Sequence, residues 1–375
     1  MIAIPWNRQT VPHCVLEITQ QCNLSCKACY REKMSHTRSV GQVLADLETI
    51  EKNQDVQTVS LAGGEPTLHP DLVEIVDRVH QRGHRVSLVT NGLLLTDDLL
   101  ARLKTAGLDI VMLHVDEEQS RPDLPENPTI EAINALRKKL SEQVARHGID
   151  AGLCVTIYKE HFGHLQHLID CITSTPDINF VFATHAAEIP DIVEHSNISA
   201  AAPNGGIYRS APTRNSDVQD FFRSTYGIDC FAYIPPKKPD SNEWPCISYY
   251  LPVLHSKTGN KLYTVQSGKA DQALIRLSRK LTGRYMYYCP PRRWIIALQL
   301  LINGASTGSF FRAFGFVLQS LAPGKRLSAK RLVFENAPVV MEDGTVNCCD
   351  FCPNSTARNG KVIPVCLADH LEPIV

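Results

Sequence analysis

Short apolar runs alternate with longer amphipathic stretches through residues 14–184. The stretches between the runs have helical spacing, and Gly83, Gly107 and Gly148 fall where left-handed helix caps are expected. Such alternation is typical of βα units around a parallel sheet. It predicts an α/β fold in which six units form a partial (βα)6 TIM barrel. The expected strands are Cys14–Thr19, Thr58–Ala62, Arg85–Thr90, Asp109–Val115, Ala151–Tyr158 and Phe180–Thr184, and the expected helices include Asp71–Arg82, Asp97–Ala106 and Thr129–Arg146.

The pattern changes after residue 186. Residues 187–245 are rich in Pro, Asn, Ser and Gly and predict a loop-rich connection or lid, with one helix around Ser216–Ser224. Residues 246–375 predict a mixed α+β, cysteine-rich extension. Its expected elements are a hairpin of Tyr249–His255 and Lys261–Gln266, helices through residues 268–322, and a second hairpin at Val339–Cys348. The chain therefore divides into residues 1–186, 187–245 and 246–375.

Charge is nearly balanced over the whole chain but not along it. The 375 residues hold 38 basic and 39 acidic side chains, so no nucleic-acid partner is expected. Residues 272–334, however, contain no acidic residue and eleven basic ones, interleaved with large apolar side chains. Helices with an apolar and a basic side suit an anionic membrane or a lipid phosphate. The alternative is that these helices pack on the barrel and turn their arginines to solvent.

The sequence also bears on the compartment. No charged segment followed by an apolar one begins the chain, so no signal peptide is expected. The longest apolar run, Trp294–Ile302, is shorter than the ~18 residues that span a bilayer. Thirteen cysteines without secretion indicate a reducing compartment and metal ligation. We expect a cytoplasmic protein with peripheral contact to a membrane.

Three cysteines follow the first predicted strand with the spacing C-x3-C-x2-C, namely Cys22, Cys26 and Cys29. Thiolates are soft ligands that suit iron–sulfur clusters, and three of them leave one iron of a 4Fe–4S cluster open to a small molecule. A zinc knuckle or three unrelated thiols are the alternatives. Structural zinc prefers four ligands, and no fourth one stands nearby in the sequence.

These cysteines, together with Gly63-Gly64-Glu65-Pro66 after the second strand, resemble the radical S-adenosylmethionine (radical SAM) superfamily. The resemblance implies that the cysteines hold a 4Fe–4S cluster whose open iron is chelated by SAM. It implies that an electron donor such as flavodoxin or ferredoxin reduces the cluster. SAM then yields a 5′-deoxyadenosyl radical that abstracts hydrogen from a substrate. One departure is Ala28, at a position that is often aromatic in the family.

The same resemblance suggests which residues bind SAM. Gly63, Gly64 and Glu65 match the glycine-rich strip of the family that binds the amino group of the SAM methionine. Asn91 lies in Thr90-Asn91-Gly92, a short motif that recurs after the third strand in the family. Asp116, after the fourth strand, is a candidate ligand of the SAM ribose. The alternative interpretation is that Asp116 is a solvent-exposed acidic residue of a loop.

The C-terminal region contains a second group of cysteines, Cys348, Cys349, Cys352 and Cys366. Four cysteines within nineteen residues predict a second metal centre. The tail resembles the auxiliary iron–sulfur extensions of SPASM and twitch type, although its spacing is atypical. We expect a second iron–sulfur cluster, with zinc as the alternative. Further ligands could come from Cys230, Cys246 or Cys289.

These observations predict a radical SAM enzyme whose substrate is a small molecule, a lipid or a peptide. The basic, apolar helices favour a lipid or isoprenoid. The C-terminal cysteines favour a peptide, as in the enzymes that modify ribosomally made peptides. A rival of another class is a non-catalytic iron–sulfur or zinc protein on the same barrel, and the intact Gly63-Gly64-Glu65 strip argues against it.

Overall fold

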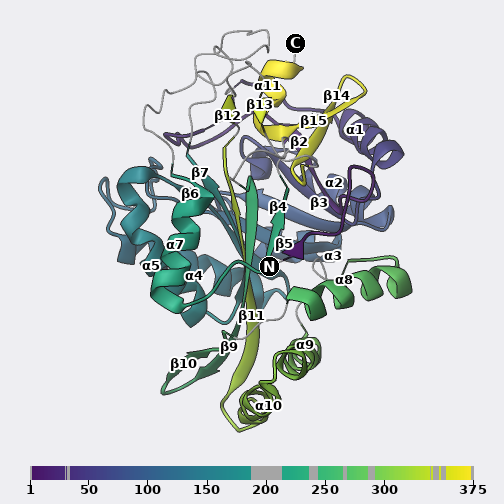
Figure 1. The fold of residues 1–375 in the computed structure, drawn as a ribbon. Helices are drawn as coiled ribbons and strands as arrows, with labels where there is room; N and C mark the ends of the chain where they lie inside the picture. The colour runs from purple at the N-terminus through teal and green to yellow at the C-terminus, as the bar shows by residue number, and fades with distance from the viewer. Residues whose placement is uncertain are drawn as a thin grey trace.

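The protein is built on one mixed sheet (Figure 1). This computed structural model describes residues 2–29, 31, 34–186, 213–235, 244–264, 268–285, 292–337, 339–340, 346–347 and 352–372. Within these ranges, eleven strands form the sheet, and two further two-stranded hairpins lie outside it.

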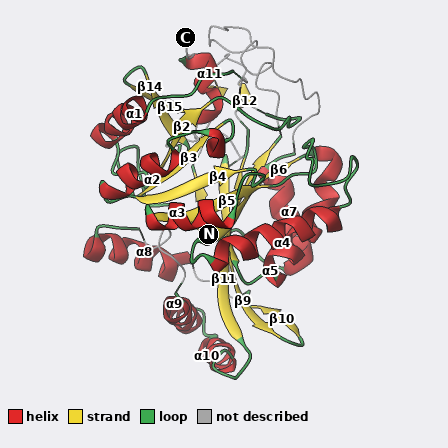
Figure 2. Ribbon diagram, turned by 180° about the vertical axis from the view of Figure 1, so that it is seen from behind, coloured by secondary structure: helices red, strands yellow, loops and turns green. Residues whose placement is uncertain are grey.

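Six parallel strands, paired in sequence order, form the centre of the sheet. They confirm the predicted order of βα units. Helices cover the outer face of these strands (Figure 2). The strands are β2 His13–Thr19, β3 Thr58–Gly63, β4 Arg85–Thr90, β5 Leu108–His114, β6 Asp150–Ile157 and β7 Ile178–His185. The helices are α1 Val40–Asn53, α2 Leu72–Gln81, α3 Asp97–Thr105, α4 Ile130–Arg146 and α5 Leu165–Ser174, with short 3-10 helices η1 Pro66–Leu68 and η2 Lys159–His164.

Local sequence explains where these helices begin and end. Ser39 caps α1 through a capping box with Gln42, and Thr129 caps α4 by accepting a bond from a backbone N–H. At the other end, Gly83 and Gly107 follow α2 and α3 with φ of 88° and 99°, a conformation that side chains disfavour. The predicted glycine caps are therefore confirmed.

The sheet continues beyond the barrel units. β11 (Arg326–Glu335) pairs parallel to β7, and β9 (Cys246–Ser256) pairs antiparallel to β11. Beyond them lie β8 (Ala232–Ile234) and β1 (Ile2–Ala3), with β10 (Gly259–Leu262) on the side of β9. The predicted hairpin is confirmed, although its second strand begins at Gly259 instead of Lys261. The division into three regions stays a prediction, and the sheet runs across it.

Three helices of the extension lie at one end of the molecule, away from the C-terminal tail (Figures 1 and 2). They are α8 Gly268–Thr282, α9 Arg293–Ser306 and α10 Phe310–Gln319, and they confirm the helical character predicted for this region. Their inner sides share an apolar cluster with β9 and β11 that includes Ile275, Ile296, Leu300 and Phe316. Helix α7 (Asn215–Tyr226) confirms the predicted helix, whereas residues 187–212 and 236–243 of the predicted lid lie outside the described residues.

The C-terminal tail lies at the end of the molecule opposite to α8, α9 and α10 (Figure 1). It contains hairpin β12 (Val339–Val340) and β13 (Val346–Asn347), as predicted, then hairpin β14 (Ser355–Arg358) and β15 (Lys361–Pro364). The second hairpin lies beside β2 and α1 (Figure 1). A short turn η4 (Val365–Leu367) and helix α11 (Ala368–Leu371) follow. Among the described helices, none has the length and apolar character needed to span a bilayer.

Candidate functional site

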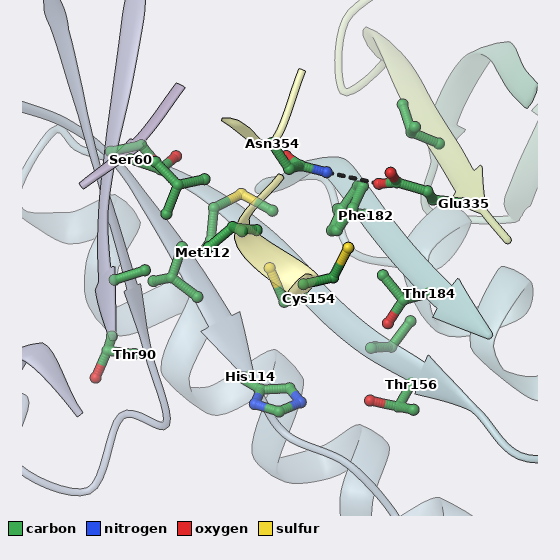
Figure 3. A pocket seen from close by; sticks show the side chains of 18 of the residues that line it. Ser60, Thr90, Met112, His114, Cys154, Thr156, Phe182, Thr184, Glu335 and Asn354 are labelled. Atoms are coloured by element: carbon green, nitrogen blue, oxygen red, sulfur yellow. Dashed lines mark hydrogen bonds between the residues drawn. The ribbon is translucent and has the colours of Figure 1, made fainter. Parts of the chain in front are cut away.

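A cavity of about 400 Å³ lies inside the barrel. Much of its wall is apolar, with Met112 on β5 and Phe182 on β7, on either side of β6 (Figure 3). The lining extends from the cysteine loop after β2 to Arg85 and Asp150 at the starts of β4 and β6. The cavity therefore reaches from one end of the barrel strands to the other.

Cys22, Cys26 and Cys29 all line this cavity and are half-buried. The loop that carries them is tied to the loop after β5. The N–H of Lys27 donates to the carbonyl of Glu118 at 3.0 Å, and Cys26 forms a β-bridge with Gln119. The structure thus brings the three predicted ligands to one cavity, at the carboxyl ends of the strands, where ligands of α/β folds bind.

The chemistry of the three sulfurs bears on which metal group fits. Thiolates are soft ligands that suit iron–sulfur clusters, whereas structural zinc prefers four protein ligands. Burial and the neighbouring Cys29, Asp116 and Cys22 raise the pKa of Cys26 to about 12. An iron–sulfur cluster would supply the positive charge that such thiolates need.

Gly63 and Gly64 are required by the close approach of two backbones. A side chain at Gly64 would place its Cβ 2.1 Å from the carbonyl oxygen of Gln21, and Gly63 has a φ of 136°. The N–H groups of Gly64 and Glu65 donate to Thr19 and Gln21, each at 2.7 Å. The glycine strip thus holds the beginning of the cysteine loop, a role that the sequence did not reveal.

Glu65 forms an internal clamp between the ends of β3 and β4. Its side chain is buried and accepts hydrogen bonds from the Thr90 hydroxyl at 2.6 Å and the Asn91 N–H at 2.7 Å. Asn91 in turn donates to Asn23 in the cysteine loop at 2.7 Å. Both predicted SAM-binding residues line the cavity, and their contact with SAM stays a prediction.

Asp116 is only 2% exposed, and its carboxylate already has partners. It accepts the Thr156 N–H at 2.9 Å and lies 2.9 Å from Nε2 of His114 and 3.8 Å from Arg137. His114 and Thr156 line the cavity (Figure 3), so Asp116 positions groups that face the cavity. Its predicted contact with the ribose stays a prediction.

The C-terminal tail supplies another part of the cavity wall. Asn354 donates to Glu335, at the end of β11, with Nδ2–Oε2 at 2.5 Å (Figure 3). On the other side, Nδ1 of His13 on β2 lies 2.5 Å from the carbonyl oxygen of Pro353. Burial lowers the pKa of His13 to about 4, so the ring is neutral and can donate this bond. The tail therefore lies between β2 and β11, a placement that sequence patterns do not indicate.

Cys352 and Cys366 of the predicted second metal centre line the same cavity, as does Cys154. Cys348, Cys349 and Cys289 lie outside the described residues. The other two candidate ligands, Cys230 and Cys246, are buried beside β8 and β9, and burial raises the pKa of each thiol. The second centre stays a prediction.

A buried network of ion pairs joins the tail to the cysteine loop. Arg358 on β14 donates to Glu17 on β2 at 2.8 Å and to Asp369 on α11 at 2.7 Å. Arg31, two residues after Cys29, pairs with the same two acids. Each of the four side chains is at most 5% exposed. The tail and the cysteine loop are therefore held by one charge-balanced unit.

Comparison with known proteins agrees with this geometry. Residues 16–171 match the family model of the radical SAM superfamily. Residues 16–171 therefore form a radical SAM domain. The cofactors of the superfamily are a 4Fe–4S cluster and SAM, and the three thiols and the glycine strip that line the cavity fit them.

Relatives with curated names match only part of this radical SAM protein. A tungsten-containing aldehyde ferredoxin oxidoreductase cofactor-modifying protein of Pyrococcus furiosus is 31% identical over 163 residues, or 41% of this chain and 46% of the relative. A probable GTP 3′,8-cyclase of Saccharolobus islandicus is 45% identical over 98 residues, 25% and 31% of the two chains. The matches thus span less than half of each relative. Among solved structures, SuiB of Streptococcus suis bound to precursor peptide SuiA has a TM-score of 0.42 at 16% identity, covering 58% of this chain and 47% of SuiB.

Proposed function

We propose that this radical SAM protein is an enzyme that abstracts a hydrogen atom from a lipid or isoprenoid substrate. The bound cluster and SAM supply the chemistry, a 5′-deoxyadenosyl radical formed by reductive cleavage of SAM. Cys22, Cys26 and Cys29 hold the cluster, with an electron donor such as flavodoxin or ferredoxin as a partner. The apolar lining of the cavity would keep water away from a radical and accommodate a hydrocarbon chain.

The observation that favours a lipid substrate is the exposed surface of α8, α9, α10 and the turn after them. This surface, which we call the helical face, carries nine of the eleven large apolar side chains that are exposed among the described residues. Phe311 is 87% exposed and Leu321 is 76% exposed. The nine are Leu277, Leu281, Trp294, Leu298, Phe310, Phe311, Phe314, Leu318 and Leu321.

The charge of the helical face fits an anionic bilayer. Residues 272–334 contain no acidic side chain, and exposed basic residues alternate along this stretch with exposed apolar ones. Each lysine or arginine near an anionic leaflet is worth about 1 kcal/mol of binding. On the helical face, the exposed basic residues are Arg276, Lys280, Arg284, Arg292, Arg293 and Arg312. We therefore include peripheral contact with the cytoplasmic leaflet in the proposal.

The position of the helical face relates it to the cavity. Helix α10 leads into the start of β11, which runs parallel to β7. The helical face therefore lies toward the starts of the barrel strands, and the cysteine loop lies at their ends. The cavity lining includes Arg85 and Asp150 at strand starts, so the cavity extends from the end of the strands nearer the helical face to the cysteine loop, an arrangement that would suit a lipid chain.

Catalysis is tested by anaerobic reconstitution, iron and sulfide analysis, and assay of 5′-deoxyadenosine after adding dithionite and SAM. We expect 5′-deoxyadenosine from the wild type and none from the Cys26→Ala variant. About eight irons per chain, falling toward four in a Cys352→Ala/Cys366→Ala variant, would support a second cluster. A fully loaded, reducible cluster that yields no 5′-deoxyadenosine, even with lipid extract or peptide added, would favour the non-catalytic rival.

The lipid is tested with perdeuterated isoprenoid lipid in vesicles, where deuterium should appear in 5′-deoxyadenosine. Flotation should show binding to vesicles that contain phosphatidylglycerol and weaker binding to pure phosphatidylcholine. Phe311→Ser with Leu321→Ser should reduce binding, whereas Leu94→Ser, an exposed leucine after β4, should not. Equal flotation of all variants would refute the contact with the helical face.

A second candidate is peptide modification, which the cavity position of Cys352 and Cys366 favours. Auxiliary cysteine ligands beside the substrate cavity would suit a peptide thiol as well as a cluster. Deuterium transfer from a labelled peptide but not from a labelled lipid would decide for this candidate.

A further inference from the structure

A group of three side chains outside the cavity has the composition of a metal site. Glu117 follows β5, and His161 and His164 lie on η2, which follows β6. Their ligand atoms all lie within 4.8 Å of one another. We propose that these three residues bind a divalent transition-metal ion of the zinc class, separate from the cysteine-bound cluster and independent of the proposed function.

The separations suit such an ion. Oε1 of Glu117 lies 2.5 Å from Nδ1 of His164, and Oε2 of Glu117 lies 3.9 Å from Nδ1 of His161. A metal with bonds of about 2.0–2.2 Å holds its ligand atoms roughly 2.9 to 3.4 Å apart. The two observed distances lie on either side of that range, and all the ligand atoms lie within 4.8 Å of one another, so side-chain movements on the order of 1 Å would complete the coordination.

The helix type explains how the two histidines come to face the same way. In a 3-10 helix, side chains three residues apart eclipse each other, and His161 and His164 have this spacing. Their rings stack with centroids 5.4 Å apart and an interplanar angle of 18°. The H-x2-H spacing on this 3-10 turn therefore places both rings on the side of Glu117.

An outer carboxylate orients one of the rings. Oε1 of Glu118 lies 2.7 Å from Nε2 of His161, which places the proton on Nε2 and leaves the Nδ1 lone pair toward Glu117. Ligating histidines usually donate their second ring N–H to a carboxylate in this way. Two imidazoles and one carboxylate suit zinc or nickel, whereas calcium and magnesium prefer oxygen ligands only. The ligand side chains are between 14% and 43% exposed, so water can fill the remaining position.

The site would fix a loop that contacts the cysteine loop. Glu118 accepts the backbone N–H of Lys27, which lies between Cys26 and Cys29. A metal ion bound by Glu117 and the histidines of η2 would therefore join the exits of β5 and β6 and restrain the loop that supports the cluster. Sequence inspection did not select these residues because Glu117 is separated from the histidines by a helix and a strand.

The experiment uses the full chain with its cluster reconstituted, dialysed against buffered free Zn²⁺ and analysed for zinc and iron. We expect the wild type to hold one zinc more than the His161→Gln/His164→Gln variant at equal iron. Glu118→Gln should weaken this zinc about 10–100-fold without removing a ligand. His147→Gln, a partly exposed histidine that pairs with Asp97, should bind zinc as the wild type does.

A second readout keeps the result independent of cysteine-bound zinc. Zn²⁺ should slow amide hydrogen exchange in residues 115–120 and 158–165 of the wild type but not of the double variant. Equal zinc in wild type and double variant, or exchange that Zn²⁺ leaves unchanged in both, would overturn the proposal. Iron content at the wild-type level confirms that the variants fold.

Discussion

Replacing Arg358 with methionine should separate the C-terminal tail from the cysteine loop. Arg358 donates to Glu17, to Asp369 and to the backbone carbonyl of Glu372 at 2.9 Å. Its side chain is 2% exposed. The substitution keeps a long apolar chain and removes the charge, so Arg31 alone remains to balance two buried carboxylates.

The expected cost follows from burial. Removing one partner of a buried ion pair leaves an uncompensated charge in a medium of low dielectric constant, at a cost of about 3–5 kcal/mol. Adding Glu17→Gln to Arg358→Met restores neutrality, because Arg31 and Asp369 remain as one pair. The double variant should therefore recover about 0.5–3 kcal/mol of the loss, the usual coupling of neighbouring charges.

The assay is anaerobic urea denaturation, together with the rate at which a chelator removes iron. Because Arg31 is two residues from Cys29, Arg358→Met should also release iron faster than the wild type. Lys361→Met is the matched control on the same hairpin, since Lys361 is 68% exposed and pairs with Glu372 at the surface. That exposed pair is worth about 0–1 kcal/mol. An Arg358→Met cost no larger than the control would refute the reasoning.

Two further predictions concern single buried positions. Burial raises the pKa of Asp271 to about 6 from 3.8, so the folded state binds this proton more tightly and stability falls as pH rises between these values. Asp271→Asn, whose amide can donate to Asn303, should remove this fall of about 3 kcal/mol, as thermal unfolding at pH 4 and pH 7 would reveal. Gly64→Ala should cost about 1–3 kcal/mol in urea denaturation because its Cβ meets the carbonyl of Gln21, whereas Gly41→Ala, with no atom nearer than 4.0 Å, should not destabilise.

The barrel could be predicted because its signals are local. The spacing of apolar residues within each segment predicts whether it forms a strand or a helix. The glycines that end the helices lie directly after them, as Gly83 does. The cysteine motif is equally local, since Cys22, Cys26 and Cys29 lie within one loop. All of these features depend on residues that are close together in the chain, so a single sequence is enough to predict them.

The remaining part of the site depends on contacts between distant residues. Arg358 and Glu17 are 341 positions apart, and Pro353 and His13 are 340 apart. Nothing in the spacing of either residue indicates its partner. The internal clamp made by Glu65 was missed for another reason: a glutamate after two glycines looks the same whether it faces a ligand or caps a neighbouring strand. Whether the helical face is covered or exposed likewise needed the tertiary structure.

The parallel pairing of β11 with β7 has a consequence for synthesis in the cell. Its partners, such as Thr184 and Glu335, are about 150 residues apart. At about 5–20 residues per second, the ribosome needs roughly 8 to 30 s between them. During that time β7 is an unpaired edge of the six parallel strands β2 to β7, and such edges recruit other chains. Expression should therefore be sensitive to chaperone supply, and slow translation through residues 186–326 should increase aggregation before any cofactor is inserted.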